Sequence, residues 1–401
     1  MDYAIRVISI AMGLASTISV AFLYAPTKSA DYFAAFSAAT LLSFILKFGM
    51  EDFVVKHYME PEDRDGYCAK ALIVTYLALL RATFFILGIA ATGAFFWPES
   101  KVLFNLIGTL LTATALAVTS TYGAIYQSQR RFRAAALLGF LVPAVILFVP
   151  LSLRMSDSPT VILFSSSAAS AAIATLFARR EIKVFDFSLT QLPKWINFFK
   201  RSSIYFLGGF GTYALTHLPI VMSRAFLEAE FTRDLSLSIR LAQSMLIVIA
   251  LMNFRFAPVV RALFLEGRRE EIWPLYSQYL RYSIFSTIVL SVMFWTIVFT
   301  ARAWLPISLK EVGSSVDLFV LAIIWLGYSA NSCFGPIGTL FIMTDRQKVN
   351  VFLTLLTLAL LVGTLFGTMS ANSEYCSAVA VSVFTLASKI PLAFLVRRAQ
   401  L

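Results

Sequence analysis

Twelve long apolar stretches fill almost the whole chain and leave only short polar joints between them. A helix needs roughly 20 apolar residues to cross a hydrocarbon core about 30 Å thick. A chain in lipid must satisfy its backbone hydrogen bonds internally, and runs this long and continuous predict helices rather than barrel strands. We therefore predict an all-α integral membrane protein with transmembrane helices at about 3–25, 31–57, 68–97, 102–127, 132–153, 158–178, 201–225, 235–260, 275–300, 316–343, 348–369 and 374–396.

Lysine and arginine set the expected orientation. They crowd into alternate joints, as at 130–133, 179–183 and 268–269. The other joints hold only Lys28, Lys101, Arg154, Arg224, Arg233, Arg302 and Lys310. The positive-inside rule then places both termini in the cytoplasm. The same asymmetry explains most of the net charge of +11, so no nucleic-acid partner is expected.

Residues 179–200 interrupt the membrane pattern. Basic residues stand at both ends of this segment, with Trp195, Phe198 and Phe199 between them. This composition is typical of a cytoplasmic linker with an interfacial amphipathic turn. We predict an N-terminal six-helix bundle at 1–178 and a C-terminal six-helix bundle at 201–401, around a central cavity.

The two halves resemble each other weakly. At an offset of 216, the segment Ser128, Gln129, Arg130 falls on Thr344, Asp345, Arg346, and each triplet ends a small-residue helix at a basic inner turn. Because each half has an even number of spans, such a repeat would be parallel, about an axis along the membrane normal.

The candidate site residues are cations at membrane depth. An ionisable side chain there is costly unless it is paired or faces water, so it marks a functional site by default. Arg81, Lys47, Arg240 and Lys389 meet this criterion and fall in both halves. For Lys47 an alternative is neutralisation by Glu51 at i,i+4 spacing. For Arg240 and Lys389 the alternative is snorkelling toward the nearer surface.

A second group comprises candidates for coupling or gating. Glu51 and Asp52 stand toward the inner end of the second span, and His217 lies in the outer half of the seventh, where a packed, satisfied role is the alternative. Pro336 follows Gly335 in mid-span and indicates either a broken helix lining a cavity or a packing kink.

The sequence offers little sign of catalysis. It contains no Ser/His/Asp, HExxH, phosphate-loop or paired-carboxylate pattern on an expected soluble surface, and no metal-ligand cluster. We therefore expect a protein that is not an enzyme and that uses no cofactor.

Three segments resemble a known superfamily. They are 126–148 at the fourth joint, 238–284, where a helix ending in a proline runs into a basic segment, and 334–356, where Gly-Pro precedes a small-residue helix end. The chain is similar to the multidrug/oligosaccharidyl-lipid/polysaccharide (MOP) exporters, and most similar to their polysaccharide transporter branch. The resemblance implies a MATE-like transporter fold.

The resemblance also implies a function and its partners. It implies a bacterial inner-membrane flippase for an O-antigen-type oligosaccharide on undecaprenyl diphosphate, together with membrane lipids and other polysaccharide-assembly proteins as partners. Buried arginine and lysine suit a diphosphate. The first span, residues 3–25, lacks the carboxylate that multidrug members commonly place there, which disfavours cationic-drug export. A non-transporting membrane scaffold and a MATE-like exporter of another amphiphile remain as alternatives.

Overall fold

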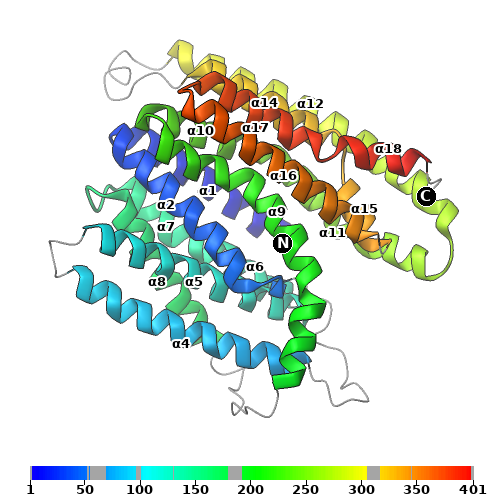
Figure 1. Ribbon diagram of the computed structural model, residues 1–401, viewed down its shortest axis with the longest axis horizontal. Coiled ribbons are helices and arrows are strands. Elements are labelled where there is room, and N and C mark those ends of the chain that lie inside the picture. Colours follow the sequence, from blue (N-terminus) through cyan, green and yellow to red (C-terminus); the bar gives the residue numbers. More distant parts are fainter. Residues whose placement is uncertain are drawn as a thin grey trace. The chain divides into compact units, whose positions relative to one another are not determined.

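The computed structural model describes residues 2–51, 54, 69–95, 101–129, 131–178, 192–304, 317–344 and 346–398. These residues are almost entirely helical, and no β-strand occurs among them. Figure 1 shows the helices as an all-α arrangement. In this part of the chain, nine helices are long and apolar enough to cross a membrane. The expected fold class is confirmed.

The first six expected spans are helical. Their helices are α1 (Asp2–Leu23), α2 (Pro26–Lys47), α4 (Ala69–Phe95), α5 (Lys101–Ser128), the run α6 (Phe132–Ala136), η1 (Leu137–Leu141) and α7 (Val142–Ser152), and α8 (Pro159–Ala178). Pro143 explains the π-helical turn η1, because it cannot donate a backbone hydrogen bond to Gly139.

The last six expected spans are also helical. Their helices are α9 (Leu192–Phe226), α10 (Ala229–Ala242) with α11 (Ser244–Leu265), α12 (Ile272–Trp304), which follows the short turn η3 (Arg269–Glu271), α14 (Leu318–Ser332) with α15 (Ile337–Met343), α16 (Gln347–Ser370), and α17 (Glu374–Ala387) with α18 (Ile390–Arg398).

The chain divides into two compact units, Met1–Tyr213 and Ala214–Leu401. The division falls inside α9, which begins at Leu192 and runs without interruption into the seventh span. Residues 192–200 are therefore the start of that helix. Residues 179–191 lie outside the described part of the chain, so the linker at 179–200 stays a prediction.

Each unit is built on one hub helix. In the first unit α5, the fourth span, packs against α2, α4 and α8. In the second unit α14, in the tenth span, packs against α10, α12 and α17. The neighbours of α5 lie in the second, third and sixth spans, and those of α14 lie in the eighth, ninth and twelfth. Each neighbour in the second unit is therefore six spans later than its counterpart in the first. The shared pattern of neighbours supports the internal repeat.

Close helix contacts repeat in the same way. A Cβ atom on Gly108 of α5 would meet the Phe164 ring of α8, at 2.7 Å from its Cζ atom. A Cβ on Gly327 of α14 would lie 2.7 Å from the Cα atom of Ser382 in α17 and 2.8 Å from its carbonyl oxygen. In both units a glycine of the hub helix therefore allows the unit's last span to approach.

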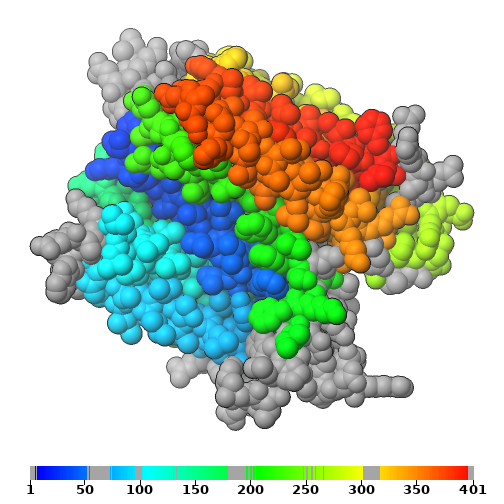
Figure 2. All heavy atoms as spheres, viewed as in Figure 1, coloured from blue at the N-terminus to red at the C-terminus, as the bar shows by residue number. Residues whose placement is uncertain are grey.

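Apolar side chains cover the outer faces of the helices. Ile86 and Ile89 of α4 are 66% and 76% exposed, and Phe285 of α12 is 68% exposed. Figure 2 shows α4 on the surface of the first unit. A protein surface of this composition suits contact with hydrocarbon rather than water.

The tenth span is interrupted beside Pro336, where the sequence indicates either a broken helix lining a cavity or a packing kink. Residues 333–336 form a turn between α14 and α15, and Gly335 adopts φ +58°, which favours glycine. Because Pro336 has no N–H to donate to Ser332, the Ser332 carbonyl accepts hydrogen bonds from Gly335 N at 3.0 Å and Ser283 Oγ at 2.7 Å. Tyr276 Oη donates to the Phe334 carbonyl at 2.9 Å.

Substituting Gly327 tests the hub contact. We expect Gly327→Ala to lower the stability of the protein by about 1–3 kcal/mol, because the added methyl group meets the Ser382 backbone, which cannot move aside as a side chain could. Gly363→Ala in α16 is the matched control, since nothing lies within 4 Å of a Cβ there. Thermal melting of purified protein should show a lower melting temperature for Gly327→Ala and an unchanged one for Gly363→Ala. Equal melting of both variants would contradict the account.

Candidate functional site

Lys47 is paired within its own segment. Its Nζ atom lies 2.9 Å from Glu51 Oε1, and Ser120 of α5 lies near the same carboxylate while its hydroxyl donates to the Ala117 carbonyl at 3.2 Å. The Lys47 side chain is 9% exposed and that of Glu51 is 34% exposed. Nζ also lies 5.3 Å from the centre of the Phe44 ring. The i,i+4 alternative is thus the observed arrangement, and the charge of Lys47 is compensated.

The turn after Lys47 is held against α9. Phe48 and Gly49 have φ of 45° and 72°, so the helical path is interrupted between Lys47 and Glu51. A Cβ on Gly49 would lie 2.6 Å from the backbone nitrogen of Phe206, and the rings of Phe48 and Phe206 stack at 4.5 Å. This close approach fixes the position from which Glu51 meets Lys47.

Arg81 faces the hub helix of the first unit. It is half-buried on α4, and its charge acts on the Tyr122 hydroxyl of α5. Within the described residues it makes no ion pair. Arg81 thus acts on a group of α5, the helix that also places Ser120 beside the Lys47–Glu51 pair. Asp52 is outside the described residues.

His217 and Arg240 come together in the second unit. His217 of α9 is 8% exposed, and the charge of Arg240 in α10 acts on its ring. Tyr328 of α14 is also buried, and its hydroxyl approaches Thr216 and Thr385 without a hydrogen bond. The second unit thus has a buried polar interior to which α9, α10, α14 and α17 contribute.

Lys389 sits at a break between α17 and α18. Pro391 lacks the N–H that would bond to Ala387, and the helix is interrupted at 388–389. Nζ of Lys389 lies 3.6 Å from where a Cβ on Gly338 would stand, and both amide atoms of Asn350 lie 4.0 Å from the same point. Lys389 makes no ion pair with any described residue. The helix break and the cation therefore occur at one place.

A buried ion pair was missed by sequence reasoning. Arg233, expected in an outer joint, is 2% exposed inside α10, and its Nη2 lies 2.6 Å from Asp234 Oδ1. Asp234 Oδ2 accepts from the Asp317 backbone N–H at 3.0 Å. Asp317 caps α14 through Phe319 N at 2.8 Å. The adjacent opposite charges were the only sequence signal, since the partners at 317 are distant in the chain.

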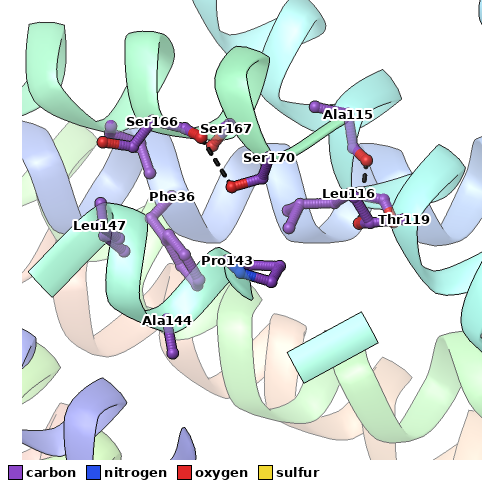
Figure 3. A pocket seen from close by; sticks show the side chains of 11 residues that line it. Phe36, Ala115, Leu116, Thr119, Pro143, Ala144, Leu147, Ser166, Ser167 and Ser170 are labelled. Carbon is purple, nitrogen blue, oxygen red and sulfur yellow. Dashed lines mark hydrogen bonds between the residues drawn. The ribbon is translucent and has the colours of Figure 1, made fainter. Parts of the chain in front are cut away.

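The first unit contains a small cavity that holds none of the expected site residues. Its volume is about 170 Å³, and it lies between α2, α5, α7 and α8. Figure 3 shows Phe36, Pro143 and Leu147 beside hydroxyl groups. Three of these hydroxyls bond to helix carbonyls: Ser170 to Ser166 at 2.8 Å, Ser166 to Ile146 at 3.0 Å, and Thr119 to Ala115 at 3.0 Å. The lining is consequently apolar and carries no charge.

The joint before α12 is an exposed charged surface. Arg268 donates to Glu271 at 2.7 and 2.8 Å and to Glu266 at 3.0 Å. The hydrogen bonds to Glu271 are the main cause of the raised pKa of Arg268. Because its charge is neutralised by its neighbours, Arg268 is a surface residue of the joint rather than part of the interior site.

Removing the partner of Lys47 tests the ion pair. We expect Glu51→Gln to destabilise the protein by about 1–3 kcal/mol, because a buried ammonium is left without its counter-charge. The double variant Lys47→Met/Glu51→Gln should recover most of that loss. A double-mutant cycle of melting curves in detergent measures the coupling, and a value near zero would show that the pair contributes nothing.

No protein-family model and no curated protein matches the chain. Solved structures match along nearly its whole length. An inward-facing multidrug resistance MATE family transporter of the MOP superfamily matches with a TM-score of 0.70 at 12% identity, over 98% of this chain and 94% of that one. The MATE multidrug transporter DinF-BH in complex with R6G matches with a TM-score of 0.64 at 14% identity, over 98% and 93%.

A third match is a MOP superfamily transporter from Pyrococcus furiosus, whose description reports a binding pocket of reverse polarity and suggests a different function. Its TM-score is 0.61 at 13% identity, over 100% of this chain and 93% of that one. Likeness at such low identity establishes the fold alone. The chain is a multi-pass membrane protein with the fold of MATE transporters.

Proposed function

We propose that this protein is a transporter that moves an anionic, lipid-linked oligosaccharide across the bacterial inner membrane. The cargo is an oligosaccharide on a polyprenyl diphosphate, and it passes from the cytoplasmic to the periplasmic leaflet without any bond being made or broken. The MATE-like fold supports a transporter of the MOP type. The branch and the cargo are what the resemblance of segments 126–148, 238–284 and 334–356 implies, and the interior charges support an anionic cargo.

The main support for the proposal is that Lys389 has no acidic partner in the described part of the chain. An ammonium at membrane depth costs several kcal/mol unless something compensates it. Lys47 has Glu51 for this purpose, whereas Lys389 has no acidic partner among the described residues. A diphosphate supplies the missing negative charge, and charge-assisted hydrogen bonds replace the water that the phosphate loses.

The remaining charges support an anionic cargo. Arg81 in the first unit and Arg240 beside His217 in the second add positive charge. The first span, residues 3–25, carries no carboxylate with which to attract a cationic drug. The interior is therefore suited to an anion and unsuited to a cation.

Broken helices provide the means of movement. The turn at 333–336 and the break at 388–389 interrupt two spans of the second unit. Such joints absorb changes in backbone angles while the helical pieces on either side stay rigid. We infer that alternating access uses these joints, and that the lipid tail stays in the bilayer during the passage.

Flipping in liposomes tests the proposal. Purified protein is reconstituted with a fluorescent undecaprenyl-diphosphate oligosaccharide, and exposure of the glycan to an external glycosidase is followed. We expect the wild type to accelerate exposure, and Arg81→Ala and Lys389→Gln each to lower the rate at least tenfold, because each loses a charged contact with the diphosphate. Lys348→Gln, at an exposed position of α16, is the matched control.

The outcomes separate the alternatives. Background exposure by folded wild-type protein with several glycans would contradict flipping and favour a non-transporting scaffold in a polysaccharide assembly complex. Accelerated exposure that Arg81→Ala leaves unchanged would keep the function and remove Arg81 from the site.

A further inference from the structure

We infer that Lys389, Asn350 and Gly338 form an oxyanion-binding site within the second unit, one that takes a single phosphate group. The three residues come from the α17–α18 break, α16 and α15. The inference rests on the proposed function for the identity of the ligand, but the site itself rests on the geometry of these residues.

The backbone break presents Lys389. Its N–H still bonds to the Leu386 carbonyl at 3.0 Å, and its carbonyl accepts from Ala393 N at 3.1 Å. The chain therefore turns at 388–389 without losing order on either side. This turn directs the lysine side chain toward α15, where Nζ comes within 3.6 Å of the Cβ position of Gly338.

Asn350 provides an independent sign of a ligand. It is 9% exposed, and its Oδ1 atom is buried without a hydrogen bond in the described part of the chain. A buried amide oxygen without a hydrogen bond lowers the stability of the folded protein by about 1–3 kcal/mol. Other polar groups of these helices do have partners. Thr344 donates to Leu340 at 2.8 Å and Thr357 donates to Leu353 at 2.8 Å.

Lys389 and Asn350 flank one point but do not bond to each other. The ammonium is 3.6 Å from the Gly338 Cβ position, and Oδ1 and Nδ2 of Asn350 are both 4.0 Å from it. Because the two amide atoms are equidistant from that point, a half-turn of the amide exchanges them there. An N–H of Asn350 can thus face the same space as the lysine ammonium.

Glycine at 338 keeps a side chain away from Lys389 and Asn350. Any other residue would place a Cβ atom at the position that the two polar groups face, at ordinary contact distance from both. An alanine would therefore fold without a clash, and its methyl group would contact Lys389 and Asn350 and narrow the space beside them. Gly338→Ala accordingly tests whether ligand binding needs the space beside residue 338, and it is expected to leave folding unchanged.

The chemistry favours an oxyanion. The site offers an ammonium and an amide donor, and no group of acidic, histidine or cysteine residues able to hold a metal ion occurs in the described residues. A phosphate oxygen accepts hydrogen bonds from both donors, and its charge compensates Lys389. The same phosphate chemistry occurs in a polyprenyl diphosphate and in the headgroup of an anionic phospholipid.

Binding of farnesyl diphosphate tests the site. The full-length protein is placed in phosphatidylcholine nanodiscs and titrated, and the affinities of the wild type, Lys389→Gln, Asn350→Asp and Gly338→Ala are compared. Asn350→Asp keeps the shape of the side chain but gives Lys389 an internal counter-charge. We expect saturable binding by the wild type and at least a tenfold weaker affinity in each variant. Lys348→Gln, two residues before Asn350 on the same helix, should bind as the wild type does.

Folding and the source of the phosphate are controlled separately. Every variant must elute as a single species and melt cooperatively. Wild-type affinity in folded Lys389→Gln and Asn350→Asp would overturn the site. Inorganic pyrophosphate that competes would show that the phosphate alone is recognised. If phosphatidylglycerol nanodiscs abolish farnesyl diphosphate binding in the wild type, the bilayer headgroup is a ligand of the same site.

The test is separable from that of the proposed function. Flipping that continues in the wild type while Lys389→Gln leaves probe binding unchanged would overturn this site and keep the function. Probe binding that the variants abolish, in a wild-type protein that flips nothing, would keep the site and overturn the function.

Discussion

The need to satisfy backbone hydrogen bonds without water shapes both the helices and the places where they break. In lipid an unpaired carbonyl costs several kcal/mol, so a span can be interrupted only where neighbouring groups take over its hydrogen bonds. Ser283 and Tyr276 of α12 do this for the Ser332 and Phe334 carbonyls, and Arg261 Nη1 donates to the Met343 carbonyl at 3.0 Å. The break beside Pro336 is thus supported from outside its own helix, and a supported break can serve as a joint.

Buried charges follow the same rule, because an uncompensated charge at membrane depth is costly. In the first unit Lys47 is compensated by Glu51, and in the second Arg233 is compensated by Asp234. These pairs bind the structure together and leave no net charge for a ligand. Lys389 has no such partner in the described chain, and it stands at the second joint of the same unit. A cation that a joint presents to the interior links ligand charge to movement, which is what a transporter of anions requires.

Local features of the sequence predicted the elements well. The length and continuity of the apolar runs predicted helices at the twelve expected positions, the Gly335-Pro336 pair indicated the break in the tenth, and i,i+4 spacing gave the Lys47–Glu51 pair as an alternative. Contacts between distant residues were beyond reach. Nothing local brings Asn350 to Lys389. Arg233 looked like an outer-joint residue because Asp317, which bonds to its partner Asp234, lies far along the chain. Residues 192–200 of the expected linker belong to α9 because apolar and basic residues both fit the end of a long helix.

The charge selectivity of transport distinguishes an anion transporter from a drug exporter with the same fold. In one set of proteoliposomes, the movement of a polyprenyl-diphosphate oligosaccharide would be measured beside that of the cationic dye R6G, with and without a proton gradient. The account predicts that the diphosphate-linked glycan moves and that the dye stays at the rate of protein-free vesicles. Transport of the dye, with the glycan left at background, would contradict it.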